Sequence, residues 1–196
     1  MMTAPSLPIQ MIVGLGNPGA QYINTRHNAG FWAINEIAKL LNNKWKYEAK
    51  FHGEFCCSNT AYGKLYLLKP ATFMNKSGVS VAALSQFYKI PSESILVIHD
   101  ELDLAAGVVR LKWSGGHAGH NGLKDIARAL GHLNVWRLRL GINHPGDRNA
   151  VADYVLSIPK IEDKIDIDNA IARCIKQLNL LSIGHFEKVM HTLHSG

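Results

Sequence analysis

Cysteine is scarce in this sequence, and the three cysteines present form no pattern that binds a metal or builds a disulfide framework. Cys56 and Cys57 are adjacent, Cys174 stands alone, and no CxxC motif occurs. An odd count of this kind argues against both a disulfide scaffold and a zinc finger. Because such cysteine usage is typical of reducing compartments, the predicted location is the cytoplasm.

Long apolar runs are also missing. No stretch of the 196 residues approaches the roughly 18–20 apolar residues needed to cross a bilayer, so no membrane partner is expected. The first residues lack the basic start and the apolar centre of a signal peptide. We therefore expect residues 1–8 to be a short disordered tail and residues 9–196 to form a single domain.

Acidic residues are absent between Glu54 and Glu93, although several lysines occur there. The whole chain carries a formal net charge of +6. A surface of one sign attracts phosphates over about one Debye length, roughly 10 Å, so a polyanionic partner is expected. Many basic proteins bind no nucleic acid, and the charge alone leaves that alternative open. The lysines of this stretch are Lys64, Lys69, Lys76 and Lys89.

Hydrophobic residues, 47% of the chain, follow two periods. Apolar runs or strict alternation indicate strands, whereas spacings of three and four residues indicate helices. The predicted strands lie within 9–15, 51–57, 65–68, 95–98, 108–113 and 136–142, and the predicted helices within 31–41, 81–88, 123–130, 161–175 and 186–193. In the helix 161–175, the stripe expected to face the core is Ile161, Ile165, Ala172 and Ile175, with Asp168 as one polar intrusion. The alternation predicts a single α/β domain with a twisted, mixed but mostly parallel sheet and helices on both faces.

A glycine-rich loop follows the first predicted strand, and it carries an amide, a phenol, a guanidinium and an imidazole. These groups belong to Asn17, Tyr22, Arg26 and His27. His27 is the expected chemical centre, because an imidazole with a pKa of about 6.5 suits a general base near neutral pH. It lies at the start of a predicted helix, where the helix dipole disfavours the imidazolium and so favours the neutral ring.

A general base also needs a group that orients it, and a carboxylate is the usual one. Asp100 comes directly after the buried strand 95–98 and is the best candidate, whereas its neighbours Glu101 and Asp103 suit solvent or a turn equally well. Loops leaving parallel strands meet at one edge of an α/β sheet. We therefore expect Asp100 and His27 to lie close together.

Two other classes of function stay open on the residues alone. His99, His117 and His120 with Asp100 would suit a metal hydrolase, although the HExxH signature and nearby cysteines are lacking. A non-catalytic RNA-binding module is the second alternative, but the sequence lacks the aromatic signature of single-strand binding.

Two loop features have a structural as well as a functional interpretation. The segment from Gly14 to Gly19 formally matches the dinucleotide fingerprint, yet Pro18 lies inside it and the expected acid, Glu36, falls on a helix. A dinucleotide site is therefore not expected.

Loop asparagines are common in turns and helix caps, but a set of three can also bind amide groups or hold a water. The three are Asn17, Asn75 and Asn121.

Short motifs spread along nearly the whole chain resemble the signature blocks of the bacterial peptidyl-tRNA hydrolase family, in the same order. The blocks are Gly14-Leu-Gly-Asn-Pro-Gly19, Tyr22, Thr25-Arg-His-Asn-Ala-Gly30, Phe73-Met-Asn-x-Ser-Gly78, His99-Asp-Glu-x-Asp103, Gly115-Gly-His-x-Gly-His-Asn-Gly122 and His144-Pro-Gly146. The resemblance implies a monomeric cytoplasmic α/β enzyme that needs no metal or other cofactor. Such an enzyme cleaves the ester between a peptide and the 3′ end of tRNA, which returns the tRNA to translation.

The resemblance also implies a role for individual residues. His27 would be the general base that activates water, Asp100 would hold it in the right tautomer, and Asn17 would help to separate N-blocked from free aminoacyl-tRNA. The peptide and the terminal adenosine would lie against Tyr22, Phe73, Asn75 and Asn121, with Met74 and His120 supporting that wall. The 5′ phosphate of the tRNA would be gripped by Lys112 and Arg139.

Three positions depart from the family pattern. Ser114 and Ala118 stand where the glycine-rich loop is usually all glycine, and Asn143 stands where glycine usually precedes His144. Glycine adopts a positive φ without strain. Ala118 is therefore expected either to stiffen the loop or to fail to adopt that conformation.

Overall fold

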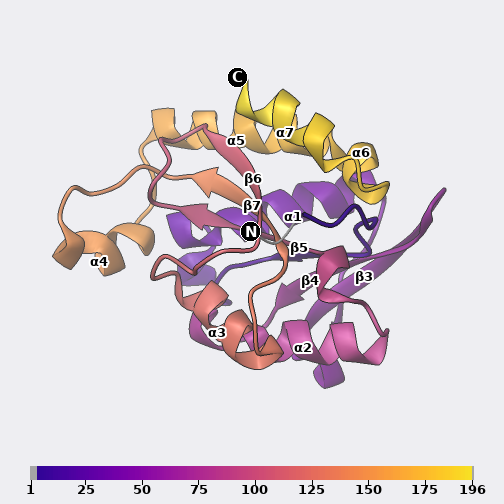
Figure 1. The fold of residues 1–196 in the computed structure, drawn as a ribbon. Coiled ribbons are helices and arrows are strands. Elements are labelled where there is room, and N and C mark those ends of the chain that lie inside the picture. The colour runs from indigo at the N-terminus through magenta and orange to yellow at the C-terminus, as the bar shows by residue number, and fades with distance from the viewer. Residues whose placement is uncertain (1–3, 196) are drawn as a thin grey trace.

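A sheet of seven strands runs through the middle of the computed structural model, which describes residues 4–195 (Figure 1). The strands are β1 (Met11–Gly14), β2 (Lys46–Glu48), β3 (Gly53–Thr60), β4 (Gly63–Pro70), β5 (Ile95–Glu101), β6 (Val109–Trp113) and β7 (Trp136–Gly141). Their order across the sheet is β2-β3-β4-β1-β5-β7-β6. The central strands β4, β1, β5 and β7 are parallel, and antiparallel strands flank them on both sides. The predicted mixed α/β sheet is confirmed.

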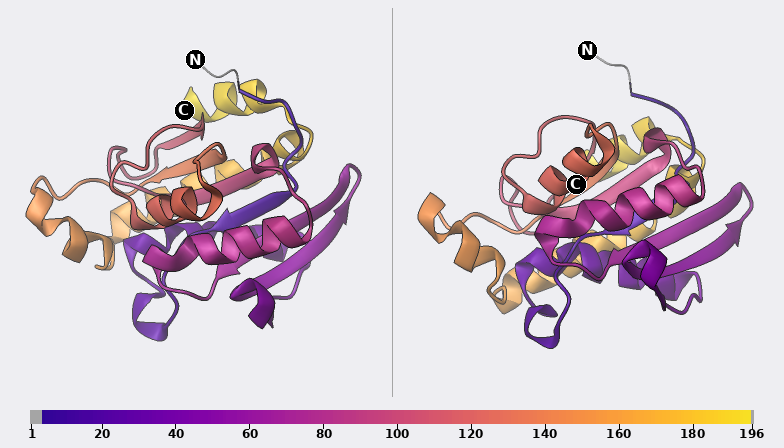
Figure 2. Two further views of the ribbon diagram at one scale, coloured as in Figure 1. Left: turned by 60° about the horizontal axis from the view of Figure 1, so that its bottom comes forward. Right: turned by 90° about the horizontal axis from the view of Figure 1, so that it is seen from below.

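Helices cover both faces of this sheet (Figure 2). One face carries α1 (Ala29–Leu40), α5 (Ile161–Ile175), α6 (Leu178–Ser182) and α7 (Phe186–His194), and the other carries α2 (Ser77–Phe87) and α3 (Asn121–Leu130). Short 3-10 helices connect these elements: η1 (Ala20–Tyr22), η2 (Arg26–Asn28), η3 (Ala49–Phe51), η4 (Met74–Lys76), η5 (Ser92–Ser94) and η6 (Arg148–Ala150). The short helix α4 (Val151–Val155) stands off to one side of the body (Figure 1).

Alternate residues of the central strands build two hydrophobic cores, one on each face. Ile12 and Ile98 belong to the core beneath α1, α5 and α7, whereas Val13 and Val97 belong to the core beneath α2 and α3. All seven residues of β5 are buried. Burial on both faces explains why residues 95–98 of this parallel strand form an uninterrupted apolar run.

Two glycines bring the start of α1 against the ends of β1 and β5. A Cβ at Gly14 would lie 2.4 Å from the carbonyl oxygen of Gly30, and a Cβ at Gly30 would lie 2.4 Å from that of Ile98. Contacts this short leave room for no side chain, so only glycine permits the approach. The turn before α1 is thereby held beside the carboxyl end of β5.

The structure corrects the face of α5 that meets the core. Ile161 and Ile165, expected inside, are 77% and 54% exposed. The buried residues of this helix are Ile167, Ala170, Ile171 and Cys174. This second stripe has the spacing i, i+3, i+4, i+7, and its small members let the helix approach the sheet closely.

Some expected boundaries also differ. β5 extends to Glu101, so Asp100 lies within the strand and not beyond it. The short elements β2, α4 and α6 were not expected from the sequence pattern. Residues 1–3 of the predicted tail lie outside the described residues, and 4–8 form no helix or strand. Within 4–195, none of the helices combines the length and the apolar character that crossing a membrane requires.

Candidate active site

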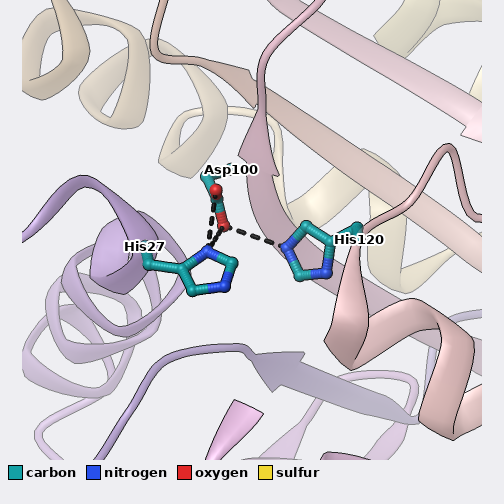
Figure 3. A group of neighbouring side chains, drawn as sticks. All are labelled: His27, Asp100 and His120. Atoms are coloured by element: carbon teal, nitrogen blue, oxygen red, sulfur yellow. Dashed lines mark hydrogen bonds and ion pairs between the residues drawn. The ribbon is translucent and has the colours of Figure 1, made fainter. Parts of the chain in front are cut away.

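His27 and Asp100 meet at the carboxyl edge of the sheet (Figure 3). His27 comes from η2, just before α1, and Asp100 comes from the end of β5. Nδ1 of the imidazole lies 2.9 Å from each of the two carboxylate oxygens. Both residues are buried, with exposed fractions of 8% and 3%. The structure thus brings together the expected base and the carboxylate that was expected to orient it.

His120 contacts the same carboxylate from the opposite side (Figure 3). Its Nε2 lies 3.0 Å from Oδ1 of Asp100, and its Nδ1 accepts the backbone N–H groups of Gly122 and Leu123 at 3.1 and 3.4 Å. His120 is therefore the N-cap of α3. Because Nδ1 accepts hydrogen bonds, the proton of the neutral ring sits on Nε2 and is donated to Asp100.

The same logic sets the tautomer of His27. Asp100 is ionised and accepts, so Nδ1–H of His27 donates to it. The lone pair of the neutral ring is then on Nε2, the nitrogen turned away from the carboxylate. A neutral imidazole held in this tautomer is the form that removes a proton from a nucleophile.

Charge and burial act in opposite directions on this pair. Burial lowers the pKa of His27, but the negative charge and the hydrogen bond of Asp100 raise it more, so the net pKa lies above its ordinary value. Burial raises the pKa of Asp100, but the two histidines lower it further, and the carboxyl stays ionised. The expectation that the helix start favours the neutral ring is therefore outweighed, because Asp100 favours the imidazolium.

The cluster of His27, Asp100 and His120 has the composition of a metal site, with its ligand atoms within 4.8 Å of one another. A neutral histidine that binds a metal through Nε2 must carry its proton on Nδ1. In His120, Nδ1 instead accepts two backbone N–H groups. The ring nitrogens of His27 and His120 that face Asp100 are therefore better suited to donating N–H groups to its carboxylate than to binding a cation.

The other histidines of the metal alternative do not complete such a site. His99 is wholly buried, and its Nδ1 donates to the carbonyl oxygen of Asp100 at 2.7 Å. Burial and the nearby His120 lower the pKa of His99 to about 3, so its ring stays neutral. In His117, Nδ1 accepts the N–H of Gly119 at 3.1 Å within the loop before α3.

Asn17 is fixed at the carboxyl end of β1 by hydrogen bonds to two neighbouring loops. Its Oδ1 accepts the N–H of Met74 at 2.8 Å. The side chain of Asn28 holds the backbone of Asn17 at both its N–H and its carbonyl, at 2.8 and 3.0 Å. Because Oδ1 is occupied, the amide N–H groups of Asn17 are the ones free to donate. Asn28 was not singled out in the sequence, although it directly follows His27.

A cavity of about 570 Å³ opens beside the cluster. His27, Asp100 and His120 line its floor, and Val151, Ala152 and Val155 of α4 line another wall. A volume in this range is typical of ligand sites in enzymes. The cavity therefore gives the histidine–aspartate pair a place to meet a substrate.

Of the aromatic and amide residues expected to bind the substrate, Asn121 lines this cavity, whereas Tyr22, Phe73 and Asn75 lie outside its lining. The rings of Tyr22 and Phe73 meet edge to face with centroids 6.3 Å apart, and Phe73 is 56% exposed. Met74 is buried beneath this surface. Asn75 and Asn121 share a second hollow of about 430 Å³ between η4 and α3.

The two basic residues expected to grip a phosphate differ in their surroundings. Nε of Arg139 donates to Oε2 of Glu101 at 2.8 Å, so this guanidinium is paired within the protein. Lys112 is exposed on β6. Arg137, which pairs with Lys112 across the two strands, donates from its guanidinium to the carbonyl oxygen of Gly116 at 2.8 Å and also to that of Ser114. This support of the loop by Arg137 was not expected from the sequence.

All three departures from the glycine pattern adopt the left-handed conformation. Ser114, Ala118 and Asn143 have φ values of 53°, 46° and 65°. Asn143 is held there by its side chain, which accepts the N–H of Ala106 at 3.0 Å and donates to Asp163 at 2.9 Å. Ala118 has no polar side chain to compensate, so it carries the backbone strain without relief.

Comparisons with known proteins bear on the family and the fold of the chain. Residues 11–196 match the family model described as peptidyl-tRNA hydrolase. A peptidyl-tRNA hydrolase of Neisseria meningitidis is 52% identical over 187 residues, covering 95% of this chain and 97% of that protein. One from Methylobacillus flagellatus is 54% identical with the same coverage. The crystal structure of peptidyl-tRNA hydrolase from Acinetobacter baumannii superposes with a TM-score of 0.91 at 45% identity, over 94% of each chain. The chain belongs to the peptidyl-tRNA hydrolase family.

Proposed function

We propose that this protein hydrolyses the ester between a peptide and the 3′ end of tRNA, and so returns free tRNA to translation. The observation that carries the proposal is the buried pair of His27 and Asp100 beside a cavity, in a chain of this family. Ester hydrolysis at neutral pH needs a base for water and donors for the developing oxyanion. The site offers both.

The chemical steps follow from the tautomers. Nε2 of His27 takes a proton from water as the water oxygen bonds to the ester carbonyl carbon. Asp100 stabilises the imidazolium that forms, because its carboxylate already accepts Nδ1–H at 2.9 Å. The tetrahedral oxyanion receives hydrogen bonds from the free amide N–H groups of Asn17 and from loop N–H groups. The intermediate then collapses, and the imidazolium returns the proton to the leaving ribose oxygen.

Substrate binding is assigned to the surfaces around this centre. Tyr22 and Phe73 offer apolar ring surface to the peptide and the terminal base, and Asn75 and Asn121 offer amide groups. Lys112 offers an exposed positive charge to phosphate, whereas Arg139 first has to leave Glu101 or to act together with it. Contacts to phosphate carry no sequence information, which suits an enzyme that accepts every tRNA.

The remaining parts of the proposal concern the state of the protein. We expect it to act as a monomer in the cytoplasm, where its substrate is formed, and to need no metal. The tautomer of His120 supports the last point, because the nitrogen that would bind a cation donates to Asp100 instead.

Deacylation of labelled N-acetyl-aminoacyl-tRNA in the presence of a chelator tests the function. The wild-type protein should release the acyl group and spare unblocked aminoacyl-tRNA. His27→Ala should slow release by about 10²–10⁴-fold, the usual contribution of a general base. His132→Ala, on an exposed histidine outside the cavity, is the matched control and should retain full activity.

Three results would refute the proposal or part of it. Near-wild-type turnover by His27→Ala would reject the assigned base. Loss of activity with chelator, restored by zinc, would favour the metal hydrolase. Tight tRNA binding with an intact ester over hours would favour the RNA-binding module.

A further inference from the structure

Arg26 immediately precedes the catalytic histidine, yet its side chain turns away from the reacting groups. It is only 4% exposed, which is unusual for an arginine. Its guanidinium runs to the segment 154–163, more than a hundred residues further along the chain. A buried charge is retained only where good partners surround it, so the contacts of Arg26 indicate a specific task.

The guanidinium joins several groups of one segment. Nη1 donates to Oγ of Ser157 at 2.7 Å and to the carbonyl oxygens of Ser157 and Ile158 at 3.3 and 3.0 Å. Nη2 lies 3.7 Å from Oδ2 of Asp163, and the guanidinium carbon lies 4.1 Å from the centre of the Tyr154 ring. A planar fork that also stacks on a ring is a property of arginine and not of lysine.

This segment carries one wall of the cavity. α4 has only five residues and stands off to one side of the sheet (Figure 1), and it meets the core through Val151, Tyr154 and Val155. Its residues Val151, Ala152 and Val155 nevertheless line the cavity together with His27. Tyr154 further donates its hydroxyl to the carbonyl oxygen of Ile142 at 2.7 Å. The wall is therefore held by apolar contacts on one side and by the chain just after α4 on the other, where Arg26 supplies the charged contacts.

We propose that Arg26 is a positioning residue that holds α4 in place as a substrate-binding wall, next to the base but without contact to the reacting atoms. The inference rests on the proposed function of the cavity. Arg26 has no hydrogen bond to the ring of His27 or to Asp100. Its backbone N–H, which donates to the carbonyl oxygen of Ser157 at 3.1 Å, remains in any substituted protein except proline. Loss of the guanidinium therefore loosens the wall and leaves the base intact.

The test compares Arg26→Lys and Arg26→Met with wild type by amide hydrogen exchange and by steady-state kinetics on N-acetyl-aminoacyl-tRNA. Exchange of residues 148–158 should become about tenfold faster, since a charge-assisted network is lost, while exchange in α1 stays unchanged. KM should rise about tenfold, kcat should stay within about twofold, and the pH profile should not move. The control is Arg173→Lys, which also replaces a guanidinium by an ammonium group, but at an exposed site of α5. It should change neither the hydrogen exchange of residues 148–158 nor KM, kcat or the pH profile.

Ser157→Ala provides a second variant in case the substitutions at Arg26 do not fold. It removes one acceptor and keeps the arginine, so exchange at 148–158 should accelerate by a smaller factor in the same direction. Unchanged exchange at 148–158 in the folded variants would overturn the inference. A fall in kcat with unchanged KM would also overturn it, because Arg26 would then act on the base. If wild type cleaves no ester, the proposed function fails, but the exchange result still decides whether Arg26 holds α4.

Discussion

Asp100 accepts hydrogen bonds from two imidazoles, and this double contact decides how His27 responds to pH. The proposed base is active when neutral, so activity should fall as the pH drops through the pKa of His27. Asp100 raises that pKa, whereas burial lowers it. Removing the carboxylate charge therefore leaves burial as the main influence on the ring.

The substitution Asp100→Asn tests this balance. We expect kcat/KM to fall by about 10²–10⁴-fold, because the tautomer and orientation of the base are lost. The acid limb of the residual activity should move to lower pH. A pH profile of kcat/KM for both proteins measures the shift, and an acid limb that stays in place or moves to higher pH would contradict the assignment.

Strain at single residues makes a second prediction at this scale. Ala118 has a φ of 46° without a polar side chain to compensate, so Ala118→Gly should raise the free energy of unfolding by up to about 1 kcal/mol. Asn143 has a similar φ but makes two side-chain hydrogen bonds. Asn143→Gly should lower the free energy of unfolding by about 1–2 kcal/mol. Urea denaturation of both variants measures these changes in the free energy of unfolding. Equal effects of the two substitutions would argue against this account.

Among the secondary-structure elements, long periodic segments were the most predictable. The helix 186–193 was expected from the apolar stripe of Phe186, Val189, Met190 and Leu193, and α7 buries all of these except Met190, which is half-buried. The elements that were missed, β2, α4 and α6, have three to five residues, too few to display a period. β5 was expected to stop at its last apolar residue. It continues because Asp100 and Glu101 pair with Leu140 and Gly141 of β7, and cross-strand pairing is not visible in a local pattern.

α5 shows how a correct helix can have a wrongly assigned face. Two stripes of the helix share helical spacing, and only the packing against the sheet selects between them. We expect Ile171→Ala, on the buried stripe, to cost about 2–5 kcal/mol of unfolding free energy. Ile165→Lys, on the exposed stripe, should change it by less than about 0.5 kcal/mol. Thermal unfolding of both variants tests the assignment, and a larger loss from Ile165→Lys would reverse it.

The candidate site was predictable where loop convergence alone placed residues. The proximity of His27 and Asp100 follows from two neighbouring parallel strands, because His27 comes from the segment after β1 and Asp100 lies at the carboxyl end of β5. The partners of Arg139 and Arg137 were not predictable, because they depend on the register of β5 and β7 and on the path of the loop after β6. The role of His120 as cap and donor likewise needed the coordinates of α3.

For the whole molecule, the charge pattern predicted from the sequence is only partly available to a polyanion. Lys69 lies 2.9 Å from Glu54 and over the ring of Trp45, so it is largely neutralised. Lys64 is exposed at the start of β4, whereas the site lies at the carboxyl ends of the parallel strands. Lys112 is exposed on β6, near the loop that leads to α3.

Salt dependence therefore distinguishes these lysines. Lys112→Ala should raise KM for the tRNA substrate and reduce the slope of log KM against log salt by about one unit, the loss of one phosphate contact. Lys64→Ala removes the same charge at a distant edge and should leave the slope unchanged. Kinetics at several salt concentrations measure both, and equal slopes for the two variants would show that only the overall charge matters.

The double use of His120 has one more consequence. The ring that begins α3 is also the ring that holds the carboxylate behind the base. Fraying at the N-terminus of this helix is thus transmitted to Asp100 through a single imidazole. Heat or denaturant that unfolds only the first turn of α3 would therefore abolish the enzymatic activity, while almost all of the helical circular-dichroism signal persists.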